Sequence, residues 1–183
     1  MKTLVFCDDL YHPAALVRAG LAPLAAAGFD FDWVEDATGW NAAGLGRYPV
    51  ALLAKSNVRS HFDKTPWLAG GVETVFLDHV RRGRGLVVIH SGTASYANVP
   101  PVRAVTGGMF LSHPPPCPVT LEPRAGHSLT AGVQDPFTVY DEHYQVVLDD
   151  PQADVFLQAR SAHGTQPAGW TRKIGRASCR ERV

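Results

Sequence analysis

The sequence predicts an α/β fold with a mostly parallel sheet, and three observations lead to this prediction. Short apolar strands alternate with helical segments over residues 1–96. The run Leu86–Ile89 is wholly apolar, which is typical of a strand that helices cover on both faces. Gly92 follows this strand, and we expect it to take a positive φ in a sharp turn. In an open α/β sheet, ligands bind outside the carboxyl ends of the strands.

Each element of this first half has a local reason. Apolar residues recur at helical spacing from Ala14 to Ala27, where Pro23 predicts a kink and Gly28 an end. Between Glu35 and Arg47 the chain is rich in glycine, and we expect a short helical turn at most. Strands are expected at Lys2–Cys7, Phe29–Val34, Tyr48–Ala54 and Leu86–His90, and helices at Ala14–Ala27 and Gly71–Arg82. This order predicts right-handed crossovers and helices on both faces of the sheet.

The second half differs from the first in composition and periodicity. Prolines crowd between Pro100 and Pro123, and no long helical stripe recurs. Four short strands are expected, at Cys117–Leu121, Phe137–Tyr140, Gln145–Leu148 and Asp154–Ala159. We expect these strands to pack on the edge of the parallel sheet without forming a second domain.

Composition excludes some classes of function. The 183 residues carry 17 basic and 17 acidic side chains, so the chain has no basic footprint for nucleic acid. No apolar run approaches the roughly 20 residues of a membrane helix, and we expect no membrane partner. Because the apolar segment after Lys2 is too short for a signal peptide, we expect a cytoplasmic protein. The odd number of cysteines, three, argues against a disulfide framework.

The last residues differ from the rest. Lys173–Val183 is basic and has no periodicity, and it resembles the translation of a sequencing adapter. We interpret it as a non-native tail and exclude it from the fold. The expected domain is therefore residues 1–172.

Candidate site residues lie at predicted strand ends. His90, Ser91 and Thr93 follow one strand, and His12 follows the first strand together with the Asp8/Asp9 pair. Because the carboxyl ends of parallel strands share one edge of a sheet, we expect His12, His90 and this acidic pair to meet.

Two chemistries fit such a set of side chains. A divalent metal could be held by imidazole and carboxylate, with His90, His113 and Glu142 as candidate ligands. Alternatively, His90 and Glu142 could act as general acid and base without a metal. A serine nucleophile would have to be Ser91, but its H-S-G context does not match G-x-S-x-G. Cys7 also ends a strand, where a buried cysteine is usually inert core.

The order of several motifs resembles the ThuA family, named for trehalose utilisation. The segments that carry the resemblance run in family order along the chain up to Arg172: Tyr11-His12-Pro13, LVVIHSGTASY, Gly107-Gly108 with His113-Pro114, HSLTAG from His127, Asp141-Glu142-His143-Tyr144, and PAGWTR from Pro167. The resemblance implies a flavodoxin-like three-layer sandwich, similar to class I glutamine amidotransferases. In those enzymes a cysteine nucleophile occupies the turn where this chain has His90. The resemblance therefore implies no glutaminase activity.

The resemblance also implies a role in carbohydrate utilisation. His90, Ser91 and Glu142 are the expected catalytic residues, and the expected ligand is a small-molecule sugar. Residues expected to bind it are His12, Gly92, Thr93, His113 and Tyr144, with Trp40, Trp67 and Tyr96 available to stack on a sugar ring. The alternative function is a non-catalytic sugar-binding module. A homo-oligomer also stays open. Because the family continues beyond Arg172 with a further strand and helix, the resemblance also implies a C-terminally truncated domain.

Overall fold

The computed structural model describes residues 1–133 and 135–174, which divide into two compact units. The first unit comprises residues 1–106 together with Ile174, and the second comprises Gly107–Lys173. Of the non-native tail predicted at Lys173–Val183, the part from residue 175 lies outside the described residues.

The first unit confirms the predicted parallel sheet. Its strands pair in the order β2-β1-β3-β4, and every pairing is parallel. The strands are β1 (Lys2–Phe6), β2 (Asp30–Val34), β3 (Val50–Leu53) and β4 (Gly85–Val88). The α-helices are α1 (Ala14–Leu21), α2 (Val75–Arg81) and α3 (Pro100–Thr106), and the 3₁₀ turns are η1 (Ala22–Ala27), η2 (Ala42–Arg47) and η3 (His90–Thr93).

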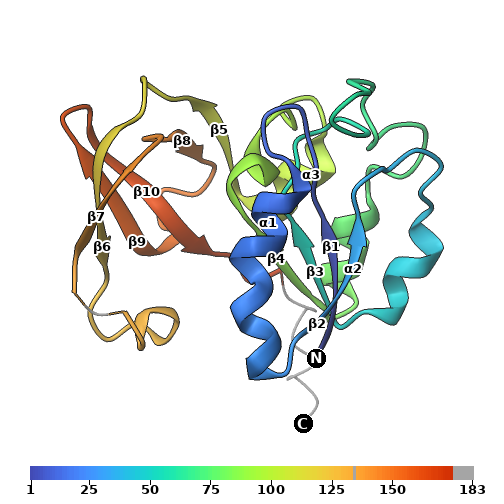
Figure 1. Ribbon diagram of the computed structural model, residues 1–183, viewed down its shortest axis with the longest axis horizontal. Coiled ribbons are helices and arrows are strands. Elements are labelled where there is room, and N and C mark those ends of the chain that lie inside the picture. Colours follow the sequence, from blue (N-terminus) through green and yellow to red (C-terminus); the bar gives the residue numbers. More distant parts are fainter. Residues whose placement is uncertain (134, 175–183) are drawn as a thin grey trace, which may run out of the picture. The chain divides into compact units, whose positions relative to one another are not determined.

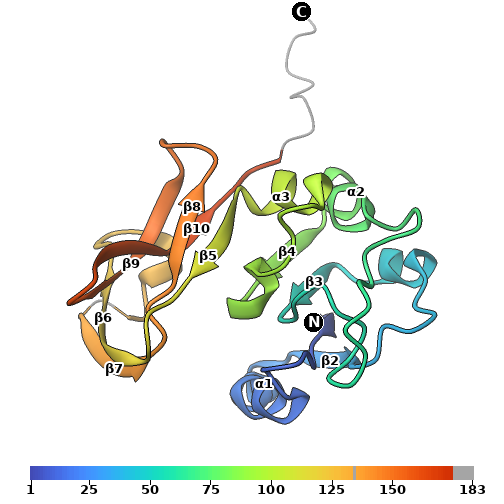
Figure 2. The ribbon, with the colours of Figure 1, turned by 90° about the horizontal axis from the view of Figure 1, so that it is seen from above.

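Helices cover the sheet of the first unit on both faces (Figure 2). Successive side chains of a strand point to opposite faces. In β1, Leu4 and Phe6 accordingly join the core cluster that contains residues of α2 and α3. Val5 and Cys7 join the other cluster, which contains residues of α1. This unit therefore has the three layers that the sequence predicts.

The helix predicted over Ala14–Ala27 changes type where the proline lies. The α-helix ends at Leu21, and residues Ala22–Ala27, which include Pro23, form a 3₁₀ turn. Gly28 ends this turn with a φ of 84°. The start of α1 has an unusual cap, because Asp8 Oδ1 accepts the Ala14 N–H (2.9 Å).

Strand 86–90 was predicted to be covered on both faces, but one of its faces is exposed. Among the described residues, β4 lies at the edge of the sheet and pairs with β3 alone (Figure 1). Leu86 and Val88 pack against the core cluster of α2 and α3, but Val87 and Ile89 are 46% and 41% exposed. The apolar run therefore has the composition of a strand that is buried on both faces, although Val87 and Ile89 lie on an exposed face.

The second unit is antiparallel. Two sheets, of order β10-β9-β6-β7 and β5-β8, contain all its strands. These strands are β5 (Gly108–Ser112), β6 (Cys117–Pro123), β7 (Phe137–Asp141), β8 (Gln145–Leu148), β9 (Asp154–Ser161) and β10 (Gly164–Thr171), with a 3₁₀ turn η4 (Ser128–Thr130). These strands pair with one another, and none pairs with a described strand of the parallel sheet; their packing on the edge of that sheet stays a prediction. The sequence prediction also missed α3, β5 and β10.

None of the helices that the structure describes is long and apolar enough to cross a membrane.

Candidate functional site

The loop after β1 is organised by the buried carboxylate of Asp9. Its Oδ1 accepts the backbone N–H groups of Tyr11 and His12 (both 3.0 Å), and its Oδ2 accepts the N–H of Ser56 (2.8 Å). The side chain of His12 also contacts Oδ1, with Nδ1 at 2.6 Å. Burial opposes the ionisation of Asp9, but these hydrogen bonds outweigh it and hold the pKa of the carboxyl well below its usual range.

This contact sets the tautomer of His12. Because an ionised carboxylate only accepts hydrogen bonds, Nδ1 of His12 carries a proton and donates it to Asp9. In the neutral ring, Nε2 is then left with a lone pair. A ring oriented in this way presents a defined nitrogen, which can take a proton or a cation.

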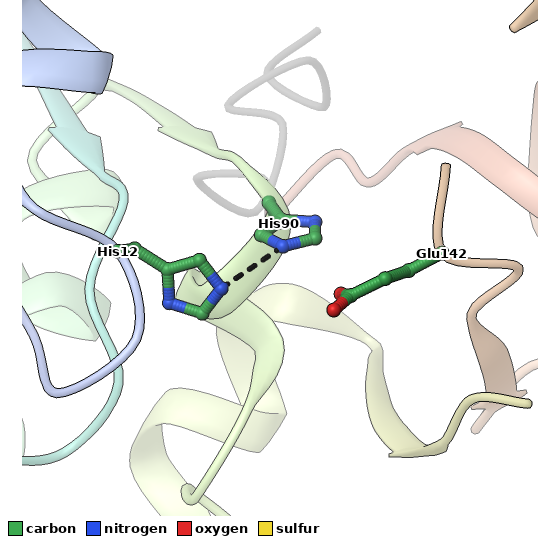
Figure 3. A group of neighbouring side chains, drawn as sticks. All are labelled: His12, His90 and Glu142. Carbon is green, nitrogen blue, oxygen red and sulfur yellow. Dashed lines mark hydrogen bonds between the residues drawn. The ribbon is translucent and has the colours of Figure 1, made fainter. Parts of the chain in front are cut away.

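His12 and His90 meet as the sequence predicts. Their Nε2 atoms lie 3.1 Å apart, and their rings cross at 82° (Figure 3). His12 follows β1 and His90 follows β4, so two separate strands bring the nitrogens together at the carboxyl edge of the sheet. The prediction that His12 and His90 meet beside the Asp8/Asp9 pair is confirmed through Asp9.

His90 itself carries the strained backbone of this turn. Its φ is 48°, in the left-handed region that residues other than glycine enter at a cost. The prediction that Gly92 takes a positive φ is wrong. Gly92 is needed for a different reason, because a Cβ there would lie 2.2 Å from the carbonyl oxygen of Leu53. The turn therefore lies directly against β3, and this contact fixes the position from which His90 projects.

The other predicted residues of this turn have mainly structural partners. Ser91 is buried, and Thr93 Oγ1 donates to the carbonyl oxygen of His90 (2.9 Å), closing the turn. The catalytic role of Ser91 and the binding roles of Gly92 and Thr93 stay predictions.

Lys55 joins the segments that follow β2 and β3, and no role was predicted for it from the sequence. The Lys55 ammonium is buried and donates to the carbonyl oxygens of Glu35 (2.9 Å) and Arg59 (2.7 Å). Burial lowers its pKa, although the nearby charges of Asp8 and Asp9 oppose the shift. The Tyr96 hydroxyl donates to the Lys55 carbonyl (2.8 Å). A lysine directly after an apolar strand was the available signal for this role.

The aromatic residues expected to stack on a sugar are part of the core instead. Trp67 and Tyr96 are buried, and Trp67 stacks on Phe6. Trp40 packs edge-on against Phe6 as well. These three residues therefore stabilise the face of the sheet that α2 and α3 cover.

In the second unit, the predicted residues His113, Glu142 and Tyr144 lie near one another. Nε2 of His113 is 3.5 Å from Oε1 of Glu142, and Nδ1 of His113 contacts the carbonyl oxygen of Pro114 (2.8 Å). The Tyr144 ring stacks with that of His113 and lies 4.3 Å from that of Phe110, between centroids. The structure brings these three residues together within the unit. That these residues share one site with His90 stays a prediction.

Three further histidines belong to local structure. His79 is buried, and burial and the charge of Arg84 lower its pKa. It lines a cavity of about 200 Å³ between η2 and α2, away from the residues of the site. His143 is buried and bonds Ser161, and His127 contacts Asp154 (3.3 Å).

Cys7 was expected to be inert, and its surroundings disfavour the reactive thiolate form. Cys7 is fully buried, and burial raises the pKa of its thiol to about 11. The thiolate is the nucleophilic form of cysteine, so this side chain is poorly suited to covalent catalysis.

Comparison with solved structures establishes the fold. A ThuA-like protein from Parabacteroides merdae superposes with a TM-score of 0.71 at 19% identity, over 93% of this chain and 74% of that one. A ThuA-like protein from Bacteroides uniformis gives 0.66 at 19% identity, with the same coverage. A glutamine amidotransferase from Thermotoga maritima gives 0.58 at 13% identity, over 86% of this chain and 66% of that one.

Comparison with families and with curated proteins gives two results. No curated protein matches the chain. The family model described as "ThuA: Trehalose utilisation" matches residues 4–179, nearly the whole sequence. The chain therefore belongs to the ThuA family, and its fold is the mixed α/β fold shared with class I glutamine amidotransferases.

Proposed function

We propose that this protein is an enzyme of carbohydrate utilisation that acts on a sugar or sugar derivative at the His12–His90 pair. The observation that carries the proposal is the 3.1 Å approach of the two Nε2 atoms at the carboxyl edge of the sheet. Ligands of open α/β sheets bind at this edge. The family name adds the class of substrate, since it refers to trehalose utilisation.

The pair has the properties of reacting groups. Strain at a functional residue is maintained only where the surrounding structure requires it, and His90 has a φ of 48° beside the close contact of Gly92 with Leu53. Asp9 holds the ring of His12 by its Nδ1, so that Nε2 is the nitrogen presented. His90 is exposed, which leaves the pair accessible to a substrate.

We also propose that the protein has no glutaminase activity. The turn that carries the cysteine nucleophile in glutamine amidotransferases has His90 in this chain. Of the described cysteines, Cys7 is buried inside the first unit and Cys117 lies in the second. Imidazole cannot replace a thiolate in forming a thioester with glutamine.

The experiment is a substrate screen by NMR with trehalose, glucose and their oxidised derivatives, comparing the wild type with His90→Ala. His163→Ala is the matched control, because His163 lies exposed in the turn between β9 and β10. Conversion of a sugar that His90→Ala loses and His163→Ala keeps would support the proposal. Saturable sugar binding without conversion would overturn it in favour of a binding module. Ammonia release from glutamine would overturn the second proposal.

A further inference from the structure

We infer that the Nε2 atoms of His12 and His90 together bind one divalent transition-metal ion, with Asp9 as the carboxylate that orients His12. The inference rests on the proposed function, because it places the ion at the proposed reacting centre. It goes further by naming a cofactor and the atoms that hold it.

The separation of the nitrogens fits two ligands of one ion. Zinc–imidazole bonds are about 2.0–2.1 Å long. Two such bonds that meet at an angle between 90° and the tetrahedral value place their nitrogens roughly 2.8–3.4 Å apart. The observed distance between the two Nε2 atoms is 3.1 Å. The pair therefore has the nitrogen spacing of two ligands of one ion.

The environment of His12 is that of a metal ligand. A histidine that binds a metal through one ring nitrogen usually donates its other N–H to a carboxylate or a carbonyl group. His12 makes this contact with Asp9 (2.6 Å), and backbone N–H groups of Tyr11, His12 and Ser56 hold that carboxylate in place. The orientation of the ring is thus set before an ion arrives.

The backbone fixes the second ligand just as firmly. His90 projects from a 3₁₀ turn that Thr93 closes and that Gly92 holds against β3. A four-coordinate zinc ion takes two further ligands beside the two histidines. Imidazole ligands favour zinc, copper, iron and nickel over calcium and magnesium. A bound ion of this kind lowers the pKa of a coordinated water and polarises a substrate oxygen.

The test is calorimetric titration of the full chain, stripped by dialysis against a chelator, with Zn²⁺ and separately with Mg²⁺. We expect one equivalent of Zn²⁺ and a much weaker response to Mg²⁺. His12→Ala and His90→Ala should each lose at least 100-fold in affinity, and Asp9→Asn should lose about 10–100-fold. The control His163→Ala should bind like the wild type. Circular dichroism of each variant shows whether it has folded.

If Asp9→Asn does not fold, the inference is still tested by the two histidine variants. Absence of saturable Zn²⁺ binding in the wild type would overturn the inference, as would unchanged binding in both folded histidine variants. Sugar conversion by a wild type that binds no Zn²⁺ would overturn the inference and leave the proposed function intact. Stoichiometric Zn²⁺ binding in a protein that neither binds nor converts any sugar would keep the metal site and refute the proposed function.

Discussion

Nδ1 of His12 lies 2.6 Å from Oδ1 of Asp9, and the same carboxylate accepts three backbone N–H groups. One buried side chain therefore both shapes the loop after β1 and orients an imidazole at the surface. Stability and site geometry are coupled at this residue, and this coupling can be measured.

Replacing Asp9 by Asn should destabilise the first unit. The variant loses the charge that strengthens four hydrogen bonds, and hydrogen bonds to charged groups contribute about 1.5–3 kcal/mol. We expect the free energy of unfolding in urea at pH 7 to fall by about this amount. The control Asp30→Asn changes an exposed aspartate on β2 and should stay within about 0.5 kcal/mol of the wild type. Equal effects of the two substitutions would contradict the role of Asp9.

The stability lost in Asp9→Asn should depend on pH in a defined direction. The pKa of Asp9 is lowered in the folded protein, whereas an unfolded aspartate titrates near about 3.9. Its contribution to stability is therefore complete above about pH 4 and is lost as the pH falls toward the folded-state pKa. The stability difference between wild type and Asp9→Asn should therefore narrow as the pH falls below about 4. A gap that widens on acidification would show that the sign is wrong.

Gly92→Ala should disrupt the turn that carries His90. The new Cβ would lie 2.2 Å from the carbonyl oxygen of Leu53 and 2.8 Å from Cγ1 of Val88, so the backbone must move. We expect a loss of about 1–3 kcal/mol, as for other overpacked sites. Gly20→Ala is the matched control, because Gly20 lies in α1 with nothing within 4 Å of its added Cβ. This control should gain stability, by about 0.5–1 kcal/mol. Thermal unfolding of the two variants compares them directly.

Because the backbone of His90 is in the left-handed region, glycine should be more stable than alanine at this position, the reverse of the usual order. Alanine at a φ of 48° keeps the left-handed strain, which costs roughly 1–2 kcal/mol, and glycine does not. His90→Gly should therefore be more stable than His90→Ala in chemical denaturation. At Ala94, whose φ is −95°, the substitution Ala94→Gly should instead reduce stability. If His90→Gly is the less stable of the pair, the strained turn is not a feature of the protein in solution.

Cys7 should resist modification in the native protein. It is buried, and burial raises the pKa of its thiol to about 11, so little thiolate exists at pH 8. Cys117 is partly exposed and should react first with iodoacetamide. Mass spectrometry of the labelled peptides gives the two rates, and unfolding in urea should bring them together. Faster labelling of Cys7 in the folded protein would contradict its burial.

The arrangement at His12 and His90 was predictable from the sequence to a large extent. Polar residues after two apolar strands indicate a shared edge when the strands are parallel, and the pairing of β1, β3 and β4 confirms this arrangement. The special conformation at the turn was assigned to Gly92, although His90 has it. Strain at a non-glycine residue leaves no local signal, because the cost is compensated by contacts made elsewhere in the chain.

Less of the second unit was predictable from the sequence. Four of its strands were predicted from short apolar runs, but β5 and β10 were not. The structure shows that these strands pair with one another, which the sequence did not predict. Alternation along one strand shows which side chains share a face, but it does not show which other strand supplies the hydrogen bonds.

The sequence by itself determined the alternation of strands and helices in the first unit, the break of the helix at Pro23, and the edge of the sheet where polar groups collect. Each of these follows from local periodicity, backbone restriction or chain direction. Only the tertiary structure decided that Trp67 and Tyr96 are core, that β4 lies at an edge of the described sheet, and that Asp9 aims the ring of His12. These facts depend on contacts between residues far apart in the chain. Burial and close packing select such contacts, and no short stretch of sequence encodes them.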